Sequence, residues 1–338
     1  MNSDRRSILA AGLALSTMLT TRGEAQTAPP SAGGPRSPGL PQPAQTIDLW
    51  PGELWPDGPP GSPGSLPREV TTERSEDPLV TDRAVLGISV PRLAVFRPDI
   101  PNGAALLLTP GGGYHHVVVD KEGYEFARWA TARGFTCFVL FYRLPYEGWA
   151  NRADVPLADA QRAMRVIRQR HRDFAIDPER VGAMGFSAGG HLCADLAARF
   201  AARTYDPRDE ADRLSAKPFC AAPIYPVVSM DPQFAHPGSR ELLLGDNPSK
   251  EAEAAHSPDR NVPADAPPHW ILHAEDDDVV PVENALLLRA ALKARGIPVE
   301  THLFQHGGHG FGLRKAVGKP IGHWPELWRD WARSIGFA

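Results

Sequence analysis

The sequence has little that points to disulfide chemistry, nucleic acids or membranes. The 338-residue chain contains only three cysteines, Cys137, Cys193 and Cys220. Each falls within a predicted strand or helix, so we expect three small buried side chains and no disulfide. The chain has 40 acidic and 36 basic residues without a basic stripe, so nucleic acid is not an expected partner. We find no internal repeat. Beyond the N-terminal segment, no apolar run reaches the roughly 20 residues that span a bilayer.

The N-terminal segment has the pattern of an export signal. Arg5-Arg6 precedes an apolar run over residues 8–19, and Gly23-Glu24-Ala25 places small residues where a signal peptidase reads them. We therefore predict a twin-arginine signal peptide over residues 1–25, cleavage after Ala25 and a periplasmic or secreted protein. The alternative is an uncleaved amphipathic N-terminus.

The next residues have the composition of a linker. Residues 26–46 are mostly Pro, Gly, Ser and Ala, with Arg36 as the single charge. Such a segment has too little apolar surface to fold, so we predict a disordered tether. Residues 47–338, about 290 residues, suit one large α/β domain better than two.

Short apolar runs alternate with amphipathic segments through this domain. Strands are predicted at 87–96 (on the edge side), 104–109, 135–142, 219–225, 270–273 and 299–304, and directly before Ser187. Helices are predicted at 122–133 and 155–172, after Ser187, from 282 to 295, and at the C-terminus, where Trp324, Trp328, Trp331 and Ile335 share one face. This alternation predicts a doubly wound, mainly parallel sheet with helices on both faces. Sites in such sheets lie at the carboxyl ends of the strands.

One stretch has the pattern of a nucleophile elbow. Gly185 and Gly189 flank Ser187 as G-x-S-x-G, between a predicted strand and a predicted helix. A serine in a strained turn needs neighbours without Cβ atoms, because the following helix passes close by. The motif alone is also compatible with an ordinary glycine-rich turn, so its context must support the interpretation.

A glycine loop follows the predicted strand at 104–109. Pro110-Gly111-Gly112-Gly113-Tyr114 can turn its backbone N–H groups toward one point. Together with the amide of Ala188, the amides of Gly112 and Gly113 are candidates to stabilise an oxyanion. A phosphate-binding loop is the competing interpretation, but the run lacks the Lys-Ser/Thr pair and the G-x-G-x-x-G spacing.

An acidic run follows the second predicted strand after the serine. Residues 275–278 are all acidic, and most such side chains are solvated. One should be buried against a histidine, to fix the tautomer of the imidazole and stabilise its protonated form. Spacing from the strand end favours Asp277, and Asp276 and Asp278 remain open.

A catalytic histidine should follow the last strand, where His302, His306 and His309 all lie. His309 has a glycine on each side, which suits a turn that must reach across to a serine. The order Ser187, Asp277, His309 is that of α/β-hydrolases. The elbow, the glycine loop and these two partners together predict an α/β-hydrolase fold with a serine nucleophile.

Several longer motifs resemble those of bacterial α/β-hydrolase esterases of the acetyl esterase and acetylxylan esterase type, also described as xylanase-like or BD-FAE-like. The matching stretches are Pro110–Tyr114, Glu122–Tyr124, Tyr142–Leu144, Asp177–Arg180, Gly185–His191, His236–Arg240, Leu243–Gly245, Asp277 with Val280–Asn284, and Gly307–Gly312. The resemblance runs from about Trp50 to the C-terminus. One departure is Pro110, where the hormone-sensitive-lipase pattern has His, and this departure favours the carbohydrate esterases.

The resemblance implies a serine esterase that acts on short-chain, chiefly acetyl, esters of a small molecule or oligosaccharide such as acetylated xylan, and the N-terminal segment predicts that this enzyme is exported. It implies no cofactor and no metal. Tyr114 and His191, which belong to the matched motifs, are expected to contact substrate. The oligomeric state is left open.

Three other functions would use some of the same residues. A metal hydrolase would use His302, His306 and His309 with the acids at 275–278, but no H-E-x-x-H or similar ligand helix is present. A non-catalytic sugar-binding protein would use aromatic side chains, namely Trp50, Trp55, Tyr114 and Trp149. A lipase or carboxylesterase for lipophilic esters would need an apolar lid. The cap segment (residues 227–263) is instead polar, apart from Leu242-Leu243-Leu244, which we expect to pack inward.

Overall fold

The computed structural model describes residues 42–52 and 58–338. The predicted signal peptide, most of the predicted linker and Trp55 lie outside these residues. Strand β1 (Gln45–Asp48) begins inside the last two residues of the predicted linker, because its backbone pairs with residues 92–95.

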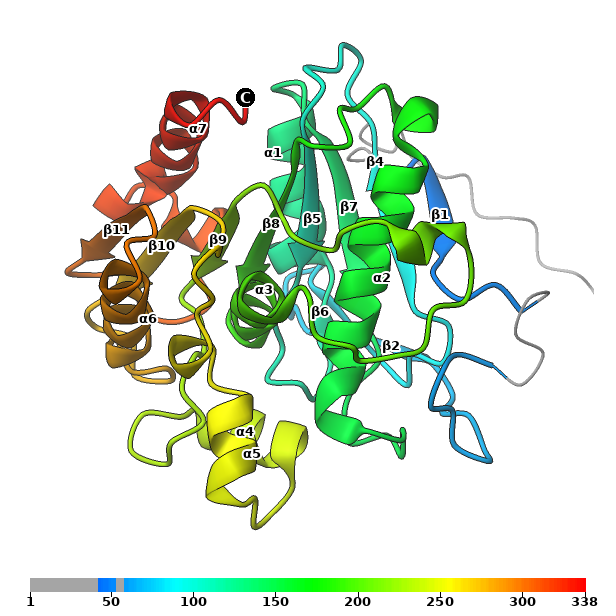
Figure 1. The fold of residues 1–338 in the computed structure, drawn as a ribbon. Helices are drawn as coiled ribbons and strands as arrows, with labels where there is room; N and C mark the ends of the chain where they lie inside the picture. Colours follow the sequence, from blue (N-terminus) through cyan, green and yellow to red (C-terminus); the bar gives the residue numbers. More distant parts are fainter. Residues whose placement is uncertain (1–41, 53–57) are drawn as a thin grey trace, which may run out of the picture. The chain divides into compact units, whose positions relative to one another are not determined.

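An eight-stranded sheet forms the centre of the domain (Figure 1), in the order β1-β4-β7-β5-β8-β9-β10-β11. β1 and β4 are antiparallel to their neighbours, and the strands from β7 to β11 run parallel. The remaining strands are β4 (Arg92–Phe96), β5 (Ala105–Thr109), β7 (Thr136–Phe141), β8 (Val181–Phe186), β9 (Ala221–Ile224), β10 (His269–Ala274) and β11 (Val299–Phe304). The predicted α/β-hydrolase architecture is thus confirmed.

The middle strands are continuous apolar runs that are buried along their whole length. Every residue of β5, β7, β8 and β10 is buried, as expected for parallel strands covered on both faces. The helices that cover the sheet are α1 (Glu125–Thr131), α2 (Val155–Gln169), α3 (Ala188–Arg199), α6 (Glu283–Ala294) and α7 (Trp324–Ser334). Helices α2, α3 and α6 lie on the face seen in Figure 1, and α1 and α7 lie on the other face.

The structure differs from the sequence prediction at the start of the domain. The predicted strand at 87–96 is shortened to β4, and β1 forms the edge beside it. A second, three-stranded antiparallel sheet was not predicted; it contains β2 (Val70–Glu73), β3 (Arg83–Leu86) and β6 (Val117–Val118). The helix expected at 122–133 begins as a wide turn at Asp120–Tyr124 and continues as α1.

The C-terminal helix packs through the aromatic face that its spacing predicts. Trp324 stacks on Phe126 of α1 with ring centroids 5.3 Å apart, and Trp328 meets the same ring edge-on at 5.6 Å. Trp331 is also buried, and Ile335 is half-buried. Buried aromatic pairs of this kind add about 0.5–1.5 kcal/mol beyond their area, so α7 is held firmly against α1.

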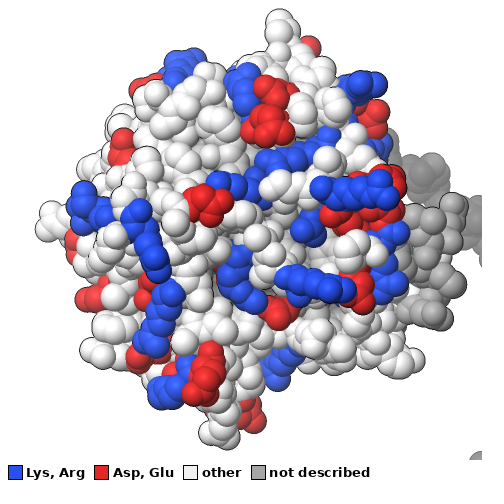
Figure 2. All heavy atoms as spheres, in the orientation of Figure 1, with Lys and Arg blue, Asp and Glu red and all other residues white. Residues whose placement is uncertain are grey.

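The three cysteines are buried and unpaired, as expected. Among the described residues, no helix is long and apolar enough to cross a membrane. On the face shown in Figure 2, Lys and Arg side chains are interspersed with Asp and Glu.

The N-terminal part of the domain is tied to the sheet by a buried ion pair. Arg143 follows β7 and pairs with Asp159 of α2 at 2.7 Å, and both side chains are fully buried. The same carboxylate accepts from Trp50 Nε1 at 2.8 Å, and Arg143 also donates to the carbonyl oxygen of Pro60. A buried charge pair without such additional partners would be costly. The motif Tyr142-Arg143-Leu144 is thus structural here.

Two buried histidines make stability depend on pH. Burial lowers the pKa of His191 and of His269 to about 4, whereas an unfolded histidine titrates near 6.5. The unfolded chain therefore binds protons that the folded chain does not. The stability that these two histidines contribute is complete above about pH 6.5. It falls as the pH decreases toward 4, by up to about 1.4 kcal/mol per pH unit for each histidine.

We expect the replacement His269→Gln to weaken this dependence. We would measure the free energy of unfolding by urea between about pH 7 and pH 5. Its slope against pH should be shallower than in the wild type, by the amount that corresponds to about one fewer proton bound on unfolding. The glutamine amide can still donate to the carbonyl oxygen of Pro267, which His269 contacts at 2.8 Å. Equal slopes in the two proteins would show that His269 is not held neutral by burial.

Candidate active site

Ser187 lies in a strained turn between β8 and α3. Its φ of 55° and ψ of −120° are unusual for a residue with a side chain. The Ser187 amide donates to the carbonyl oxygen of Ile224, and its own carbonyl oxygen accepts from the amides of His191 and Val227. These hydrogen bonds hold the turn and leave the hydroxyl at the carboxyl end of the sheet.

The two flanking glycines are required by close backbone approach. A Cβ at Gly185 would lie 2.1 Å from the carbonyl oxygen of Gly189 and 2.3 Å from Thr109 Oγ1. A Cβ at Gly189 would lie 2.0 Å from the carbonyl oxygen of Thr109. Real Cβ atoms do not approach other atoms so closely, so the G-x-S-x-G pattern follows from packing of β5 against the elbow.

The structure brings Ser187, His309 and Asp277 together although they are distant in the sequence. Ser187 Oγ lies 2.8 Å from His309 Nε2, and His309 Nδ1 lies 2.7 Å from Asp277 Oδ2. A carboxylate can only accept, so Nδ1 carries the proton and Nε2 is left to accept the serine proton. The geometry is that of a serine nucleophile with its base and an orienting acid.

Asp277 is held as a carboxylate. Burial alone would raise the pKa of Asp277, but hydrogen bonds from His273 and His309 and from the amide of Val280 hold it well below its usual range. Oδ1 accepts from the amides of Val279 and Val280, while Oδ2 accepts from both histidines. The side chain is therefore charged and fixed in one orientation.

The loop that carries His309 is positioned by a second acid. Asp276 Oδ1 accepts from the amides of Gly307 and Gly308 at 2.8 and 2.7 Å. Gly308 and Gly310 have φ values of 66° and 64°, which glycine adopts without strain. Asp276 thus shapes the loop without contacting the imidazole of His309 itself.

The other acids and histidines of the two runs lie elsewhere. Asp278 is exposed, His302 contacts Glu300 at 2.7 Å, and His306 contacts Asp276 at the surface. In the part of the chain that the structure describes, no group of three or more His, Cys, Asp or Glu residues is placed to hold a metal ion.

The glycine loop places backbone N–H groups beside Ser187. Gly112 and Gly113 have φ values of 128° and 66°, and within the described residues their amides donate to no other group. Ala188 is the first residue of α3, so its amide also lacks a helical partner. The amide of Gly111, by contrast, donates to Glu122 Oε2 at 3.0 Å. The amides of Gly112, Gly113 and Ala188 therefore remain candidate donors for an oxyanion.

Tyr114 and His191, which were expected to contact substrate, lie in the interior instead. Each is only 1% exposed, and the two side chains are hydrogen-bonded to each other. His191 Nε2 donates to the carbonyl oxygen of His256 at 2.8 Å, so its Nδ1 accepts from the Tyr114 hydroxyl at 2.7 Å. Tyr114 also has a φ of 62°. The pair thus ties the glycine loop to α3 and to the cap segment.

Sequence reasoning missed three residues beside the triad. His273 is fully buried and donates to Asp277, yet its position inside β10 looked like that of an ordinary core residue. Glu122 accepts from Tyr225 Oη at 3.1 Å and from the loop amide described above. His236, at the start of α4 (Pro237–Leu244), lines the pocket. Glu122 and His236 belong to the matched motifs, and His273 is the last residue of the strand predicted at 270–273. Only the fold brings these three residues close to the triad.

A pocket of about 440 Å³ opens at Ser187. Its lining comes from the glycine loop, residues 118–122, the cap segment, the region after β2, Val279 after β10, and the loop that carries His309, called the histidine loop below. The residues are Arg74, Gly112, Gly113, His115, His116, Val118, Lys121, Glu122, Ser187, His236, Gly238, Leu242, Val279, His309, Gly310 and Lys315.

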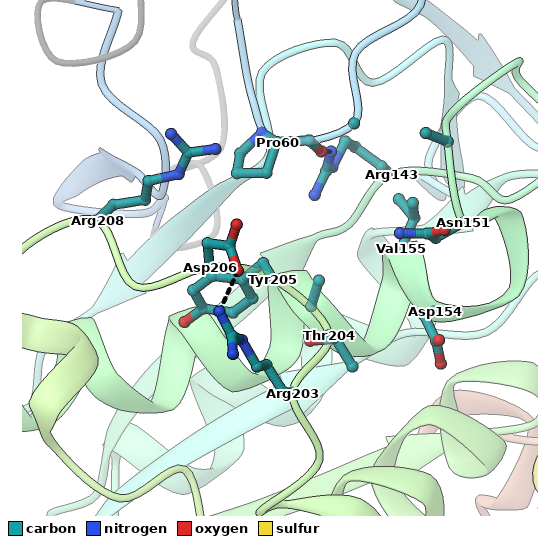
Figure 3. A pocket seen from close by; sticks show the side chains of 13 residues that line it. Pro60, Arg143, Asn151, Asp154, Val155, Arg203, Thr204, Tyr205, Asp206 and Arg208 are labelled. Atoms are coloured by element: carbon teal, nitrogen blue, oxygen red, sulfur yellow. Dashed lines mark hydrogen bonds and ion pairs between the residues drawn. The ribbon is translucent and has the colours of Figure 1, made fainter.

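A second pocket, of about 310 Å³, contains none of these residues. Figure 3 shows it between Pro60, Arg143 and Arg208 on one side and Arg203 and Asp206 on the other. Arg203 and Asp206 form an ion pair at 2.6 Å. This pocket holds no nucleophile with an adjacent base, so the pocket at Ser187 is the candidate active site.

The three adjacent acids should differ sharply on substitution. We expect Asp277→Asn to lower kcat by about 10³–10⁴-fold, because an amide cannot fix the histidine tautomer. Asp278→Asn should leave kcat within about twofold. The loss of kcat in Asp276→Asn should lie between these two, because this change weakens the hydrogen bonds that hold the loop but does not alter the tautomer of His309. Steady-state kinetics on 4-nitrophenyl acetate would test this order, and equal losses at Asp277 and Asp278 would contradict it.

Comparison with known proteins agrees with this geometry. The BD-FAE family model matches residues 102–292, a span that includes Ser187 and Asp277. An acetylxylan esterase from Xylanibacter ruminicola is 32% identical over 226 residues, covering 66% of this chain and 44% of that protein. Endo-1,4-beta-xylanase B from Butyrivibrio fibrisolvens is 36% identical over 222 residues, covering 65% of this chain and 34% of that protein. The aligned region is therefore less than half the length of either relative.

Solved structures agree with the fold. The acetyl ester-xyloside bifunctional hydrolase from Caldicellulosiruptor lactoaceticus is 35% identical with a TM-score of 0.69, covering 81% of this chain and 99% of that one. An esterase from Thermogutta terrifontis is similar in fold, at 23% identity and a TM-score of 0.60, over 80% of this chain and 96% of that one. Since the family model covers more than half of the chain, this protein belongs to the BD-FAE family.

Proposed function

We propose that this protein is a serine esterase that removes short acyl groups, chiefly acetyl, from carbohydrate esters such as acetylated xylan or its oligosaccharides. The observation that carries the proposal is the continuous contact from Ser187 Oγ through His309 to the buried carboxylate of Asp277. Relatives named as an acetylxylan esterase and an acetyl ester-xyloside hydrolase support the substrate class.

The proposed reaction has two halves. Ser187 Oγ attacks the ester carbonyl carbon while His309 Nε2 takes the hydroxyl proton. The carbonyl oxygen becomes an oxyanion that accepts from the amides of Gly112, Gly113 and Ala188, and each such donor is worth about 3 kcal/mol in other hydrolases. The alcohol then leaves with the proton from His309, and the acyl group remains on Ser187.

Water completes the cycle. His309 removes a proton from water as it attacks the acyl carbonyl, and returns that proton to Ser187 Oγ when the carboxylic acid leaves. Asp277 stays ionised throughout and stabilises the imidazolium. The proposed steps use no cofactor.

The cap segment supports short acyl groups. Leu243 is buried, and Leu242 and Leu244 are half-buried, so helix α4 presents no broad apolar face. The residues that connect α4 to α5 (Lys250–Ala255), at 245–249, are polar or small. Such a surface does not suit adsorption to an oil interface, which would be needed for the alternative function of a lipase.

We also propose export through the twin-arginine segment at Arg5-Arg6. The supporting observation is the sequence pattern alone. A periplasmic protein whose mature N-terminus is Gln26, measured by mass spectrometry, would agree with this proposal, and an intact chain in the cytoplasm would contradict it.

Replacing the nucleophile tests the reaction. Ser187→Ala should lower kcat on 4-nitrophenyl acetate by about 10⁵–10⁶-fold, as in other serine hydrolases. The thermal unfolding midpoint should not fall, because alanine removes only one hydroxyl. Residual activity above about 1% in a folded variant would contradict the assignment of Ser187.

An acyl series tests the substrate class. We expect kcat/KM to be highest for acetate esters and to decline from butyrate to decanoate, together with release of acetate from acetylated xylan. A steady rise toward decanoate, with activation at an emulsion surface, would favour a lipase instead.

A further inference from the structure

The pocket at Ser187 has an uneven distribution of charge. Among its lining residues, Arg74, Lys121 and Lys315 are basic, and Glu122 is the only acid. We refer to these three basic residues as the basic rim. They come from three separate segments: the end of β2, the turn before α1 and the loop after His309. The triad chemistry makes no use of their charge.

The nearby carboxylates are already occupied. Glu122 accepts from the amide of Gly111 and from Tyr225 Oη, and its Oε1 lies 3.7 Å from Lys121 Nζ. Asp82 is shared between Arg74, at 3.7 Å, and Arg314, at 2.8 Å. Both carboxylates therefore already have a basic side chain beside them.

Lys315 has no acidic partner among the described residues. The neighbouring ammonium of Lys121 lowers the pKa of Lys315, with burial as the second cause, and Asp82 acts weakly in the opposite direction. Like charges placed together repel unless an anion lies between them. The exposed ammonium of Lys315 thus points to an anionic group on the molecule that enters the pocket.

One member of the basic rim, Lys121, lies against the loop that carries the catalytic base His309. A Cβ at Gly310 would lie 3.2 Å from Lys121 Nζ, and a Cβ at Gly312 would lie 3.1 Å from Lys121 Cγ. Lys121 therefore packs against the loop that carries His309. Because His309 delivers its proton to the leaving alcohol, a group near Lys121 and Lys315 belongs to the alcohol rather than to the acyl chain.

Two imidazoles of the pocket, those of His116 and His236, do not supply this charge. Burial, followed by the neighbouring Arg74, lowers the pKa of His116 to about 4. Burial, followed by His309, also lowers the pKa of His236. Both shifts favour the neutral ring, so neither of these two imidazoles adds to the positive charge of the basic rim.

We propose that the basic rim binds a carboxylate on the alcohol part of the substrate, so that the preferred substrate is an acylated sugar bearing a uronic acid. This inference rests on the proposed esterase function and names its substrate class more narrowly. Lys315 supplies most of the specificity, because Arg74 and Lys121 are each partly neutralised, by Asp82 and by Glu122, at 3.7 Å.

The test compares two probes that differ only in charge. The first is a methyl glucuronoside acetylated on one hydroxyl, and the second is its carboxamide, acetylated on the same hydroxyl. We expect kcat/KM at low salt to be about five- to tenfold higher for the acid, as for one partly exposed ion pair. This ratio should approach one at about 0.5 M NaCl, because salt screens exposed charges.

Variants locate the effect. Lys315→Met should lower the acid-to-amide ratio by about threefold or more, and Lys315→Met combined with Arg74→Gln should bring it close to one. Lys319→Met is the matched control, because Lys319 is an exposed lysine of the same loop that does not line the pocket. It should keep the wild-type ratio. Both rim residues are exposed, and the ratio is measured within each variant, so altered stability does not change the result.

The outcomes separate the two proposals. Equal hydrolysis of acid and amide by the wild type would overturn the uronic acid inference and leave the esterase function intact. A preference for 4-nitrophenyl monosuccinate over 4-nitrophenyl butyrate, without discrimination on the sugar side, would overturn the assignment to the alcohol. Failure to hydrolyse either sugar probe or 4-nitrophenyl acetate would overturn the proposed function and the inference with it.

Discussion

The close approach of strand β5 to the elbow is the constraint on which the site depends. Thr109 Oγ1 donates to the carbonyl oxygen of Gly189 at 2.8 Å. These same two atoms leave no room for a side chain at Gly185, and the carbonyl oxygen of Thr109 leaves none at Gly189. At this point the chain makes a turn in which Ser187 has a positive φ. Because the glycine loop continues directly from β5, the same contact places its amides beside the nucleophile.

Buried hydrogen bonds extend this arrangement to the other loops. Glu122 holds the amide of Gly111 and the hydroxyl of Tyr225, and that hydroxyl accepts from the amide of Gly312 at 3.2 Å. The glycine loop and the histidine loop are thereby joined through one carboxylate. A second series of hydrogen bonds runs from Tyr114 of the glycine loop through His191 to the cap segment. Fully satisfied buried networks rigidify a structure, so the donors and the base keep fixed positions relative to the serine.

Much of the fold could be predicted because its central strands and helices have strong patterns. The parallel strands are continuous apolar runs, and the aromatic spacing of α7 is regular. Strand β1 could not be predicted, because only one of its four residues is buried and it follows a proline-rich segment. Strand β2 is exposed along its whole length and has no apolar alternation. Both strands form because neighbouring backbone is available for pairing, which a local pattern does not reveal.

By itself, the sequence determined the elbow at Ser187, the glycine loop and the histidine loop, because each depends on neighbours within a few residues. Spacing favoured Asp277 but left Asp276 and Asp278 open, and only the tertiary structure shows which carboxylate turns toward His309. Tyr114 was likewise placed by packing, in the interior rather than in the pocket. The basic rim arises from segments far apart in the sequence, and charge on one surface is a property of the folded chain.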